Sequence, residues 1–527
     1  MFKTHFAKVK NKLQHCVNFS YPYATAINLH ITPNTEGLSA KPFESIPGPS
    51  KLQLLRAFMP GGRFYQKSFI EFNRQLRSQY GDIFLVPGLF GKRDVLFTYN
   101  PKDYQQVFRT EGLYPIRRGL DIIQYHRKEL RKDVFKHAVG LVAEQGENWS
   151  KFRSAVNPVM MNPKTITMYI PKTDQMAKKF IECIKRIRDP NTQEVPENFE
   201  EYIKYWTMDS VGLIALDTDL NMLDNSEAQP DAKIVIDNME EFFQLLLELD
   251  MQPSMWKFIA TPKFKKIIRI LDLVNELSLT YVNKALERLQ REGKNKPEQE
   301  KSILERLASK DPLIAATMAM DIFLAGVDTT TSALTACLLT LATNAKKQAN
   351  LRRELLTILP DKNSALNQEN MKNLPYLRAC IKESLRLYPV ATGNFRTTGQ
   401  DTVLSGFRVP ANTDVSMTAQ LLLKDPKYFE YPDKFLPERW LRSQALAEAE
   451  NVCPANKGDP FVYLPFGFGP RICIGKRIVD LELETVLARL LRNFEIKFDY
   501  STADMFKTNI INIPAKPLKF KFCDLYN

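Results

Sequence analysis

The segment of residues 313–343 constrains the fold strongly, because Asp321 and Asp328 are its only charged residues. Asp311 and Pro312 precede it, as an N-cap followed by proline at the first helical position. A helix of this length would span roughly 45 Å, and such an apolar helix either crosses a membrane or forms the axis of a core. Each aspartate would cost roughly 3 kcal/mol at a bilayer centre. We therefore predict a helix that crosses the interior of the protein.

The rest of the chain predicts one large unit built mainly from helices. Its 527 residues are 44% hydrophobic, and no Gly/Ser linker, repeat or low-complexity tract divides them. Helical periodicity dominates between about residues 140 and 390. Short strands are predicted at 95–98, around 403–407, at 494–497 and at 518–522. The expected fold class is α+β and mainly α, with a small β region beside a helical body and its long central helix.

Cysteine and histidine usage restricts the metal chemistry. The seven cysteines include no C-x-x-C pair, which argues against a disulfide framework, a zinc ribbon and covalently attached c-type haem. Three of the five histidines lie within the first 30 residues, which leaves His126 and His137 for the body. A histidine-based metal cage or catalytic triad is therefore not expected.

The net charge of +13 makes nucleic acid the first partner to consider. The basic residues are mostly interspersed with acids, however, and no nucleic-acid motif is present. We expect no nucleic-acid partner. A positive patch that docks an acidic protein fits the charge better.

The N-terminal residues predict a targeting leader. Residues 1–35 carry four lysines, no acid and no arginine, and they lack both an apolar run of membrane-spanning length and a secretory h-region. A basic, hydroxyl-containing leader of this kind indicates mitochondrial import; the alternative is a basic tail without a targeting role. Residues 46–49, IPGP, make a stiff turn that ends it. The expected division is a leader at 1–40, a Pro-rich hinge at 41–50 and one domain at 51–527.

Residues 466–475, FGFGPRICIG, surround one cysteine with glycines. Cys473 stands two residues after Arg471 and just before a strongly helical segment. Glycine permits close backbone approach because it has no Cβ, and a helix N-terminus favours a negative sulfur. Arg471 would offer a cation to a haem propionate. The pattern predicts a thiolate presented to a haem iron, rather than a structural cysteine in a Gly-rich loop.

This segment resembles the haem-binding loop of the cytochrome P450 monooxygenases, and the match extends from about residue 45 to the C-terminus. The resemblance implies haem b (iron protoporphyrin IX), with Cys473 as its axial metal ligand and with Phe466, Gly469 and Gly475 shaping the loop. A thiolate ligand pushes electron density onto iron and favours O–O cleavage. The implied reaction inserts one oxygen atom from O2 into a lipophilic small molecule.

Residues 325–330, AGVDTT, lie within the apolar segment and match the oxygen-activating groove of the same family. Two protons are needed before the O–O bond breaks, so an acid beside a hydroxyl suits the task. The implied catalytic residues are Asp328, which would relay protons, and Thr329, which would bond a bound oxygen species. Gly326 costs about 1 kcal/mol against alanine and would let a flat ligand approach. The alternative is small residues that pack helix to helix.

Further motifs carry implied roles in holding the haem. Glu383 and Arg386, three residues apart on one helix face, would join Arg439 of the 437–440 PERW motif in a structural triad that locks the haem loop. Trp149 and Arg153 are one helical turn apart. The propionate contacts that the resemblance implies are Trp149, Arg153, Arg396 and Arg471.

Monooxygenation also needs two electrons from outside the protein. Arg378 and Lys382 are four residues apart on one helix, and Lys476 and Arg477 directly follow the haem loop. Mitochondrial members of the family dock an acidic [2Fe–2S] ferredoxin, itself fed by a reductase, on such residues. The alternative is an ordinary solvated helix face.

Residues 58–62, 90–94 and 157–161 resemble the insect family-12 group of mitochondrial members, which is associated with oxidation of foreign compounds. The implied location is the matrix side of the mitochondrion, with peripheral association with the inner membrane. A steroid (ecdysteroid-type) hydroxylase, a non-catalytic haem sensor and a peroxide-rearranging enzyme remain alternatives. Substrate contacts are expected from five segments: 115–140, 235–275, 323–329, 390–395 and 509–513.

Overall fold

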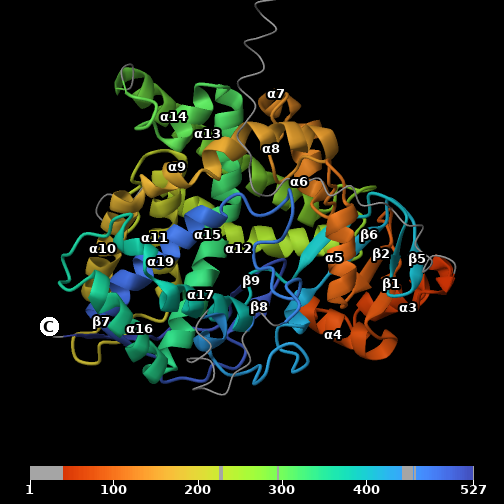
Figure 1. Ribbon diagram of the computed structural model, residues 1–527. Helices are drawn as coiled ribbons and strands as arrows, with labels where there is room; N and C mark the ends of the chain where they lie inside the picture. Colours follow the sequence, from red (N-terminus) through yellow and green to blue (C-terminus); the bar gives the residue numbers. More distant parts are fainter. Residues whose placement is uncertain (1–38, 225–229, 293–295, 442–454, 456–457, 526–527) are drawn as a thin grey trace, which may run out of the picture.

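The computed structural model describes residues 39–224, 230–292, 296–441, 455 and 458–525 (Figure 1). The leader predicted at residues 1–40 therefore lies outside the described residues except for its last two positions.

The predicted central helix is α15 (Pro312–Ala342), which lies in the middle of the helical body (Figure 1). The Asp311 carboxylate caps it by accepting hydrogen bonds from the Leu313 and Ile314 amides at 2.8 and 3.2 Å. Among the described helices it alone is long and apolar enough to span a membrane, and 78% of its most apolar window is buried inside the protein. The prediction of an internal axis is confirmed.

The other helices lie before and after α15 in the chain. The N-terminal part contains η1 (Phe43–Ser45), α3 (Lys51–Phe58), α4 (Phe69–Tyr80), α5 (Pro101–Thr110), α6 (Asp121–Tyr125), η2 (His126–Leu130), α7 (Lys132–Phe135), α8 (Gly146–Met160), α9 (Pro163–Thr167), α10 (Ile170–Ile187), α11 (Phe199–Ala215), α12 (Pro230–Leu246), η3 (Leu247–Met251), α13 (Pro262–Glu292) and α14 (Ile303–Ala308). After the axis come α16 (Ala345–Ile358), η4 (Asn370–Lys372), α17 (Pro375–Leu387), η5 (Ala419–Leu421), η6 (Pro437–Trp440) and α19 (Lys476–Asn493).

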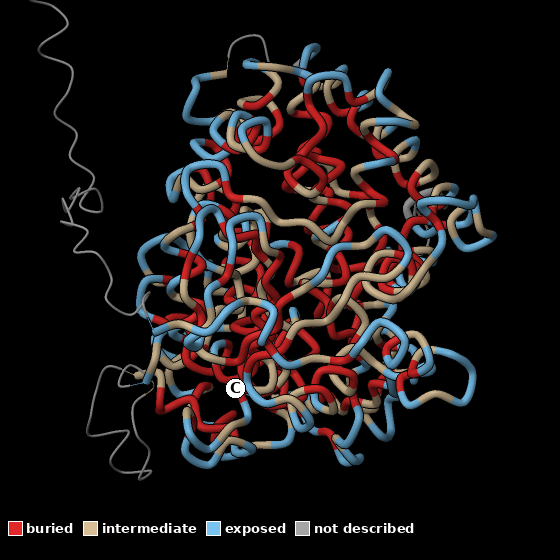
Figure 2. Tube along the Cα trace, turned by 90° about the vertical axis from the view of Figure 1, so that its right-hand side faces the viewer, coloured by how far each residue is buried: buried red, intermediate tan, exposed pale blue. Residues whose placement is uncertain are grey.

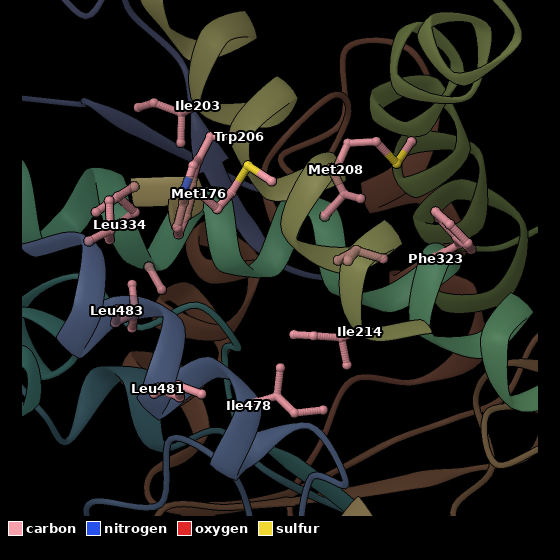
Figure 3. Close-up of a cluster of buried hydrophobic side chains, with 14 of the residues drawn as sticks. Met176, Ile203, Trp206, Met208, Ile214, Phe323, Leu334, Ile478, Leu481 and Leu483 are labelled. Carbon is pink, nitrogen blue, oxygen red and sulfur yellow. The ribbon is translucent and has the colours of Figure 1, made fainter. Parts of the chain in front are cut away.

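The core of the helical body forms where α10, α11, α15 and α19 meet. Figure 3 shows apolar side chains from these four helices gathered together, among them Met176, Trp206, Phe323 and Leu483. Trp206 is only 2% exposed. Burial of an apolar side chain of this kind stabilises the fold by roughly 1.5–3 kcal/mol, so these contacts fix α11 and α19 against the axis.

A four-stranded sheet forms most of the β region, in the order β1 (Ile83–Val86), β2 (Val95–Thr98), β6 (Asp414–Met417) and β3 (Asn394–Thr397). β1 and β2 are antiparallel with Ile83 opposite Thr98, β2 and β6 are parallel, and β3 is antiparallel to β6. The strand predicted at 95–98 is confirmed. One face carries an aromatic core, in which the Phe84 and Phe97 rings stack at 5.3 Å.

The strand predicted around 403–407 is instead a hairpin of β4 (Thr402–Leu404) and β5 (Phe407–Val409). Ser405 and Gly406 both have positive φ, at 46° and 81°, and form its two-residue turn. Near the C-terminus, β7 (Phe494–Lys497) pairs with β10 (Lys521–Asp524), so that predicted pairing is confirmed with its second strand shifted towards the C-terminus. β8 (Phe506–Thr508) and β9 (Asn512–Pro514) form a further hairpin.

The Pro-rich residues 41–50 lie against the edges of these sheets. The Lys41 amide donates to the Gly406 carbonyl at 2.9 Å, and the Lys41 carbonyl accepts from Arg408 at 2.8 Å. Further along, the Pro47 carbonyl accepts from the Leu85 amide at 2.8 Å. The segment is thus part of the folded body, whose buried stretches occupy the interior while exposed turns surround them (Figure 2).

Candidate active site

The loop at residues 466–475 closes tightly before α19 begins. The Cys473 amide donates to the Phe466 carbonyl at 2.9 Å, which fixes the loop as a narrow turn. Gly469 has φ of +75°, and a Cβ at this position would lie 2.6 Å from Oε1 of Glu111. Both facts require glycine there, because other residues are strained at positive φ and would also clash.

The start of α19 directs backbone amides at the Cys473 sulfur. Burial raises the pKa of the Cys473 thiol, while the Gly475 and Lys476 amides and the Arg153 and Arg117 guanidinium groups oppose the rise. The Cys473 thiol lies deep in the protein but can be reached from outside. Cys183, Cys337 and Cys380 are buried by the packed chain. These surroundings suit a thiolate that becomes stable when a metal ion binds it, because metal binding releases the thiol proton.

Four guanidinium groups gather here, because Arg117, Arg153 and Arg396 all lie near Arg471. Arg117 and Arg153 also lie near the Cys473 thiol. Burial, followed by the charges of Arg117 and Arg396, lowers the pKa of Arg471 to about 8. Burial likewise lowers the pKa values of Arg117 and Arg153 to about 10. Nε of Arg153 and Nη1 of Arg471 are buried without a hydrogen-bond partner. Cations packed this closely with unused donors favour an anionic ligand.

The surrounding chain holds these arginines in place. Arg471 donates to the Pro115 carbonyl at 2.8 Å and to Oε1 of Gln145 at 2.9 Å, and its guanidinium lies 4.2 Å above the Trp149 ring. The Gln145 side chain also accepts from the Arg117 amide and donates to its carbonyl, at 2.8 and 2.7 Å. Trp149 and Arg153 both lie on α8, and both are buried.

Arg396 makes contacts that the sequence did not indicate. Its Nε lies 2.5 Å from Oε2 of Glu111, and its Nη2 donates to the Phe468 carbonyl at 3.1 Å. Arg396 therefore already has a carboxylate partner, and it links the haem-loop segment to the end of α5. Arg117, which sequence reasoning missed, is a further member of the cluster. It lies in a loop without a recognisable motif, so local sequence gave no signal for it.

The middle of α15 presents a strip of small residues. Ala325 is exposed and Gly326 and Thr329 are half-buried, although their neighbours Val327 and Asp328 are buried. The Thr329 hydroxyl donates to the Ala325 carbonyl at 2.6 Å. A Cβ on Gly326 would lie 3.1 Å from Cγ2 of Val211, so this glycine also permits close packing against α11. The helix-packing interpretation thus accounts for Gly326, and the approach of a ligand there stays a prediction.

Asp328 and Thr329 face different surroundings because successive helical residues point about 100° apart. Oδ1 of Asp328 lies 3.7 Å from Nζ of Lys204 on α11. Burial raises the pKa of Asp328 to about 6, and the Lys204 charge opposes the rise. The carboxyl group therefore titrates near neutrality, where a proton relay needs it to exchange protons.

The three residues expected to form a triad come together at the end of α17. The Glu383 carboxylate accepts from Nε and Nη2 of Arg386, both at 2.9 Å, and from Nε of Arg439 at 3.0 Å. It also accepts from the Leu436 amide at 3.0 Å and from Nε1 of Trp440 at 2.8 Å. Trp440 is thus an additional partner of this carboxylate that the sequence reasoning missed.

The four basic residues expected to dock a partner differ in their ion pairs and in their exposure. Arg378 pairs with Glu484 at 2.7 Å, and Lys476 pairs with Asp480 at 2.6 Å. These two carboxylates on α19 reduce the positive charge that the sequence suggested for this surface. Lys382 and Arg477 are exposed, and Nζ of Lys382 lies 5.9 Å from the Trp440 ring centre.

These surroundings fit iron protoporphyrin, whose iron accepts a thiolate and whose propionates accept guanidinium donors. No group of three or more His, Cys, Asp or Glu side chains gathers as a metal site among the described residues. A mainly helical body with a deep thiol just before α19 is the arrangement expected of the haem-thiolate monooxygenases.

The comparisons with known proteins agree with this class. The cytochrome P450 family model matches residues 47–522, and the chain belongs to this family. It is 48% identical to the probable cytochrome P450 12a5, mitochondrial, of Drosophila melanogaster, over 93% of each chain. It is 46% identical to cytochrome P450 CYP12A2 of Musca domestica, over 94% of this chain and 93% of the other. A third relative, the probable cytochrome P450 12d1 distal, mitochondrial, of Drosophila melanogaster, is 45% identical over 92% of each chain.

These matches confirm the predicted family, the mainly helical fold class and the resemblance to the insect family-12 group. As a cytochrome P450, the protein is a monooxygenase with a haem-thiolate cofactor that uses O2 and external redox partners.

Proposed function

We propose that this protein is a mitochondrial monooxygenase that oxidises lipophilic foreign compounds with electrons from an acidic [2Fe–2S] ferredoxin, itself fed by a reductase. The observation that carries the proposal is the Cys473 thiol, at which the first amides of α19 are directed. Haem b bound to this thiolate supplies the activation of O2. The relatives named as mitochondrial support the location, and matrix-side attachment to the inner membrane belongs to the proposal.

The residues around the thiol have distinct roles in this proposal. Arg153 and Arg471, each with an unused buried donor, hold the propionates together with Arg117. The Trp149 ring packs against the Arg471 guanidinium and thus supports it. Arg396 acts mainly through Glu111, which it orients beside Gly469. Phe466 and Gly475 fix the two ends of the cysteine turn.

The proton chemistry falls to α15. Burial raises the pKa of Asp328 to about 6, so this carboxyl group exchanges protons close to neutral pH, and Thr329 presents its hydroxyl on the strip that contains Ala325 and Gly326. Substrate lies against the same strip, because small side chains leave room for an apolar molecule beside the hydroxyl. The Glu383 carboxylate keeps η6 and α17 together and thus supports the loop segment that leads to Cys473.

In this proposal Lys382 and Arg477 contribute to ferredoxin docking because both residues are exposed. The carboxylate partners of Arg378 and Lys476 reduce the positive charge that those two residues offer. Lys382 lies on α17 directly before Glu383. Arg477 lies in the first turn of α19, shortly after Cys473. Electrostatic docking of this kind raises the association rate and makes it sensitive to salt.

The segment between η3 and α13 supports attachment to a membrane. Met255, Phe258 and Ile259 are 38%, 65% and 59% exposed, and Lys257 and Lys265 beside them are exposed as well. Exposed apolar side chains flanked by lysines favour binding to an anionic lipid surface. Sedimentation with anionic vesicles tests this point, and Phe258→Ser should reduce the bound fraction.

The reduced protein's difference spectrum with carbon monoxide tests the central proposal. We expect the red-shifted Soret band of a thiolate-ligated haem, and we expect Cys473→Ser to abolish it. A wild-type protein that is folded but shows no such band would overturn the proposal. Product analysis with foreign compounds and with steroids then decides between xenobiotic oxidation and steroid hydroxylation.

A further inference from the structure

A half-buried lysine joins two parts of the chain that are far apart in sequence. Lys92 lies in the loop between β1 and β2, and its ammonium group donates to the Leu249 carbonyl at 2.8 Å and to the Gln252 carbonyl. Leu249 belongs to η3, and Gln252 directly follows it. A cation suits the C-terminal end of a helix, where carbonyls lack partners within the helix. Lys92 therefore ties the end of η3 to the β1–β2 loop.

A carboxyl group lies at the same junction. Oδ2 of Asp250 accepts a hydrogen bond from the Ile122 amide in the first turn of α6 at 3.1 Å, whereas Oδ1 is buried without a hydrogen-bond partner. Beside it, Asp121 of α6 pairs with Lys257 at 2.6 Å. One small group of charged side chains thus holds the β1–β2 loop, α6 and η3 together.

The segment 252–261, between η3 and α13, rests on this junction. The Phe258 ring lies so close to Gly91 of the β1–β2 loop that a Cβ on Gly91 would be 3.2 Å from its Cζ. Trp256 stacks on Phe264 of α13, with ring centres 5.6 Å apart. The exposed apolar side chains proposed above to contact a membrane belong to this segment. Its release would therefore move an apolar stretch of chain away from the β1–β2 loop.

The junction disfavours the charged forms of both groups. Burial lowers the pKa of Lys92; the Lys257 charge lowers it further, while Asp250 and Asp121 oppose the change. Burial raises the pKa of Asp250, and the Asp121 charge raises it further, while the Ile122 amide and both lysines oppose the rise. The attraction between the two groups therefore does not offset the cost of burying their charges.

We propose that Lys92 and Asp250 form a pH-sensitive latch, which holds segment 252–261 against the β1–β2 loop and releases it most readily when both side chains are ionised. This inference rests on the membrane attachment proposed above and adds a means of regulating it. The closed state keeps Phe258 against Gly91. The open state offers the apolar side chains of the segment to lipid.

The direction of the pH dependence follows from the two pKa shifts. Asp250 binds its proton more tightly in the closed state, so closure is favoured at acid pH and weakens as the pH rises through the raised pKa. Lys92 loses its proton more readily in the closed state, so closure is favoured at alkaline pH and weakens as the pH falls through the lowered pKa. The latch is therefore weakest between these two pKa values.

Hydrogen exchange of residues 252–261 in the haem-loaded protein measures the opening without turnover. The rates are corrected at each pH for the intrinsic exchange of an unstructured peptide. We expect protection to pass through a minimum between the two pKa values and to rise by up to about tenfold per pH unit on either side, because one proton is linked to closure on each side. Protection that does not depend on pH in the wild-type protein overturns the proposal.

Two variants separate the contributions of the two groups. Asp250→Asn should remove the rise in protection at acid pH, and Lys92→Arg should remove the rise at alkaline pH, because a guanidinium group stays charged there. Lys263→Met is the matched control, since Lys263 pairs with Glu248 of η3 at 2.7 Å but its side chain is 62% exposed. The control should keep both rises. If folded Asp250→Asn and Lys92→Arg keep the wild-type pH dependence, the latch is refuted.

Sedimentation with vesicles that contain phosphatidylglycerol gives the second readout. We expect the bound fraction to be largest where protection is lowest, and we expect Phe258→Ser to lower it while the minimum in protection remains. If exchange shows the minimum but vesicle binding does not follow it, the membrane attachment is refuted and the latch stands. If vesicle binding is intact and exchange is independent of pH, the latch alone is refuted. The thiolate Soret band reports separately on the monooxygenase function.

Discussion

Replacement of Glu383 by alanine should destabilise the protein more than almost any other single change on α17. The Glu383 and Arg386 side chains are 0% exposed and that of Arg439 is 1% exposed, so the substitution leaves two buried guanidinium groups without their shared carboxylate. Removing one partner of a buried ion pair costs about 3–5 kcal/mol. The lost bonds from the Leu436 amide and Trp440 add to this cost. Total stabilities of native domains are about 5–15 kcal/mol, so the variant should approach unfolding.

Urea unfolding of the haem-loaded protein, followed by circular dichroism and by the Soret band, measures this effect. Glu383→Gln should lie between wild type and Glu383→Ala, because the amide oxygen still accepts hydrogen bonds but carries no charge. Glu182→Ala is the control, since Glu182 is 69% exposed and its pair with Lys185 contributes about 0.2–1 kcal/mol at most. If Glu383→Ala unfolds within about 1 kcal/mol of the control, the reasoning about buried charge is wrong.

Two further predictions follow from the loop and from the surface. Gly469→Ala should lower haem content sharply, because the added Cβ would clash with Glu111. Gly406 has a similar positive φ but nothing within 4 Å of an added Cβ, so Gly406→Ala should lower the free energy of unfolding by only about 1 kcal/mol. Haem content and urea midpoints of both variants measure the difference, and equal losses would contradict the predicted clash at Gly469. Arg477→Glu should slow electron transfer from ferredoxin and flatten its salt dependence, while Lys185→Glu on the exposed part of α10 should not. Stopped-flow reduction at several salt concentrations tests this, and identical slopes for Arg477→Glu and wild type would argue against docking at the start of α19.

Features encoded by neighbouring residues were predictable from the sequence. α15 follows from an uncharged run behind an Asp-Pro N-cap, and the cysteine turn follows from glycines spaced for positive φ. The Glu383–Arg386 contact was also predictable from the sequence, because residues three apart share a helix face.

Contacts between distant segments were not predictable, because local pattern carries no information about the partner. Glu111 meets Arg396 across 285 positions of sequence, and Arg378 meets Glu484 across 106. Asp328 was assigned a proton-relay role, but no periodicity could indicate that Lys204 on another helix would face it. Such pairs arise from the packing of α11 and α19 against the axis, which is a property of the whole fold.

The backbone bonds made by Lys41 and Pro47 have a consequence for where the N-terminal region can be cut. Lys41 pairs beside β5, and Pro47 pairs with β1, which is the last strand on its side of the four-stranded sheet. A strand with unpaired backbone groups is a template for other chains. Cleavage upstream of Lys41 would keep the backbone hydrogen bonds at both sheet edges. Cleavage beyond Pro47 would expose unpaired backbone groups there, and we would expect the shortened protein to aggregate.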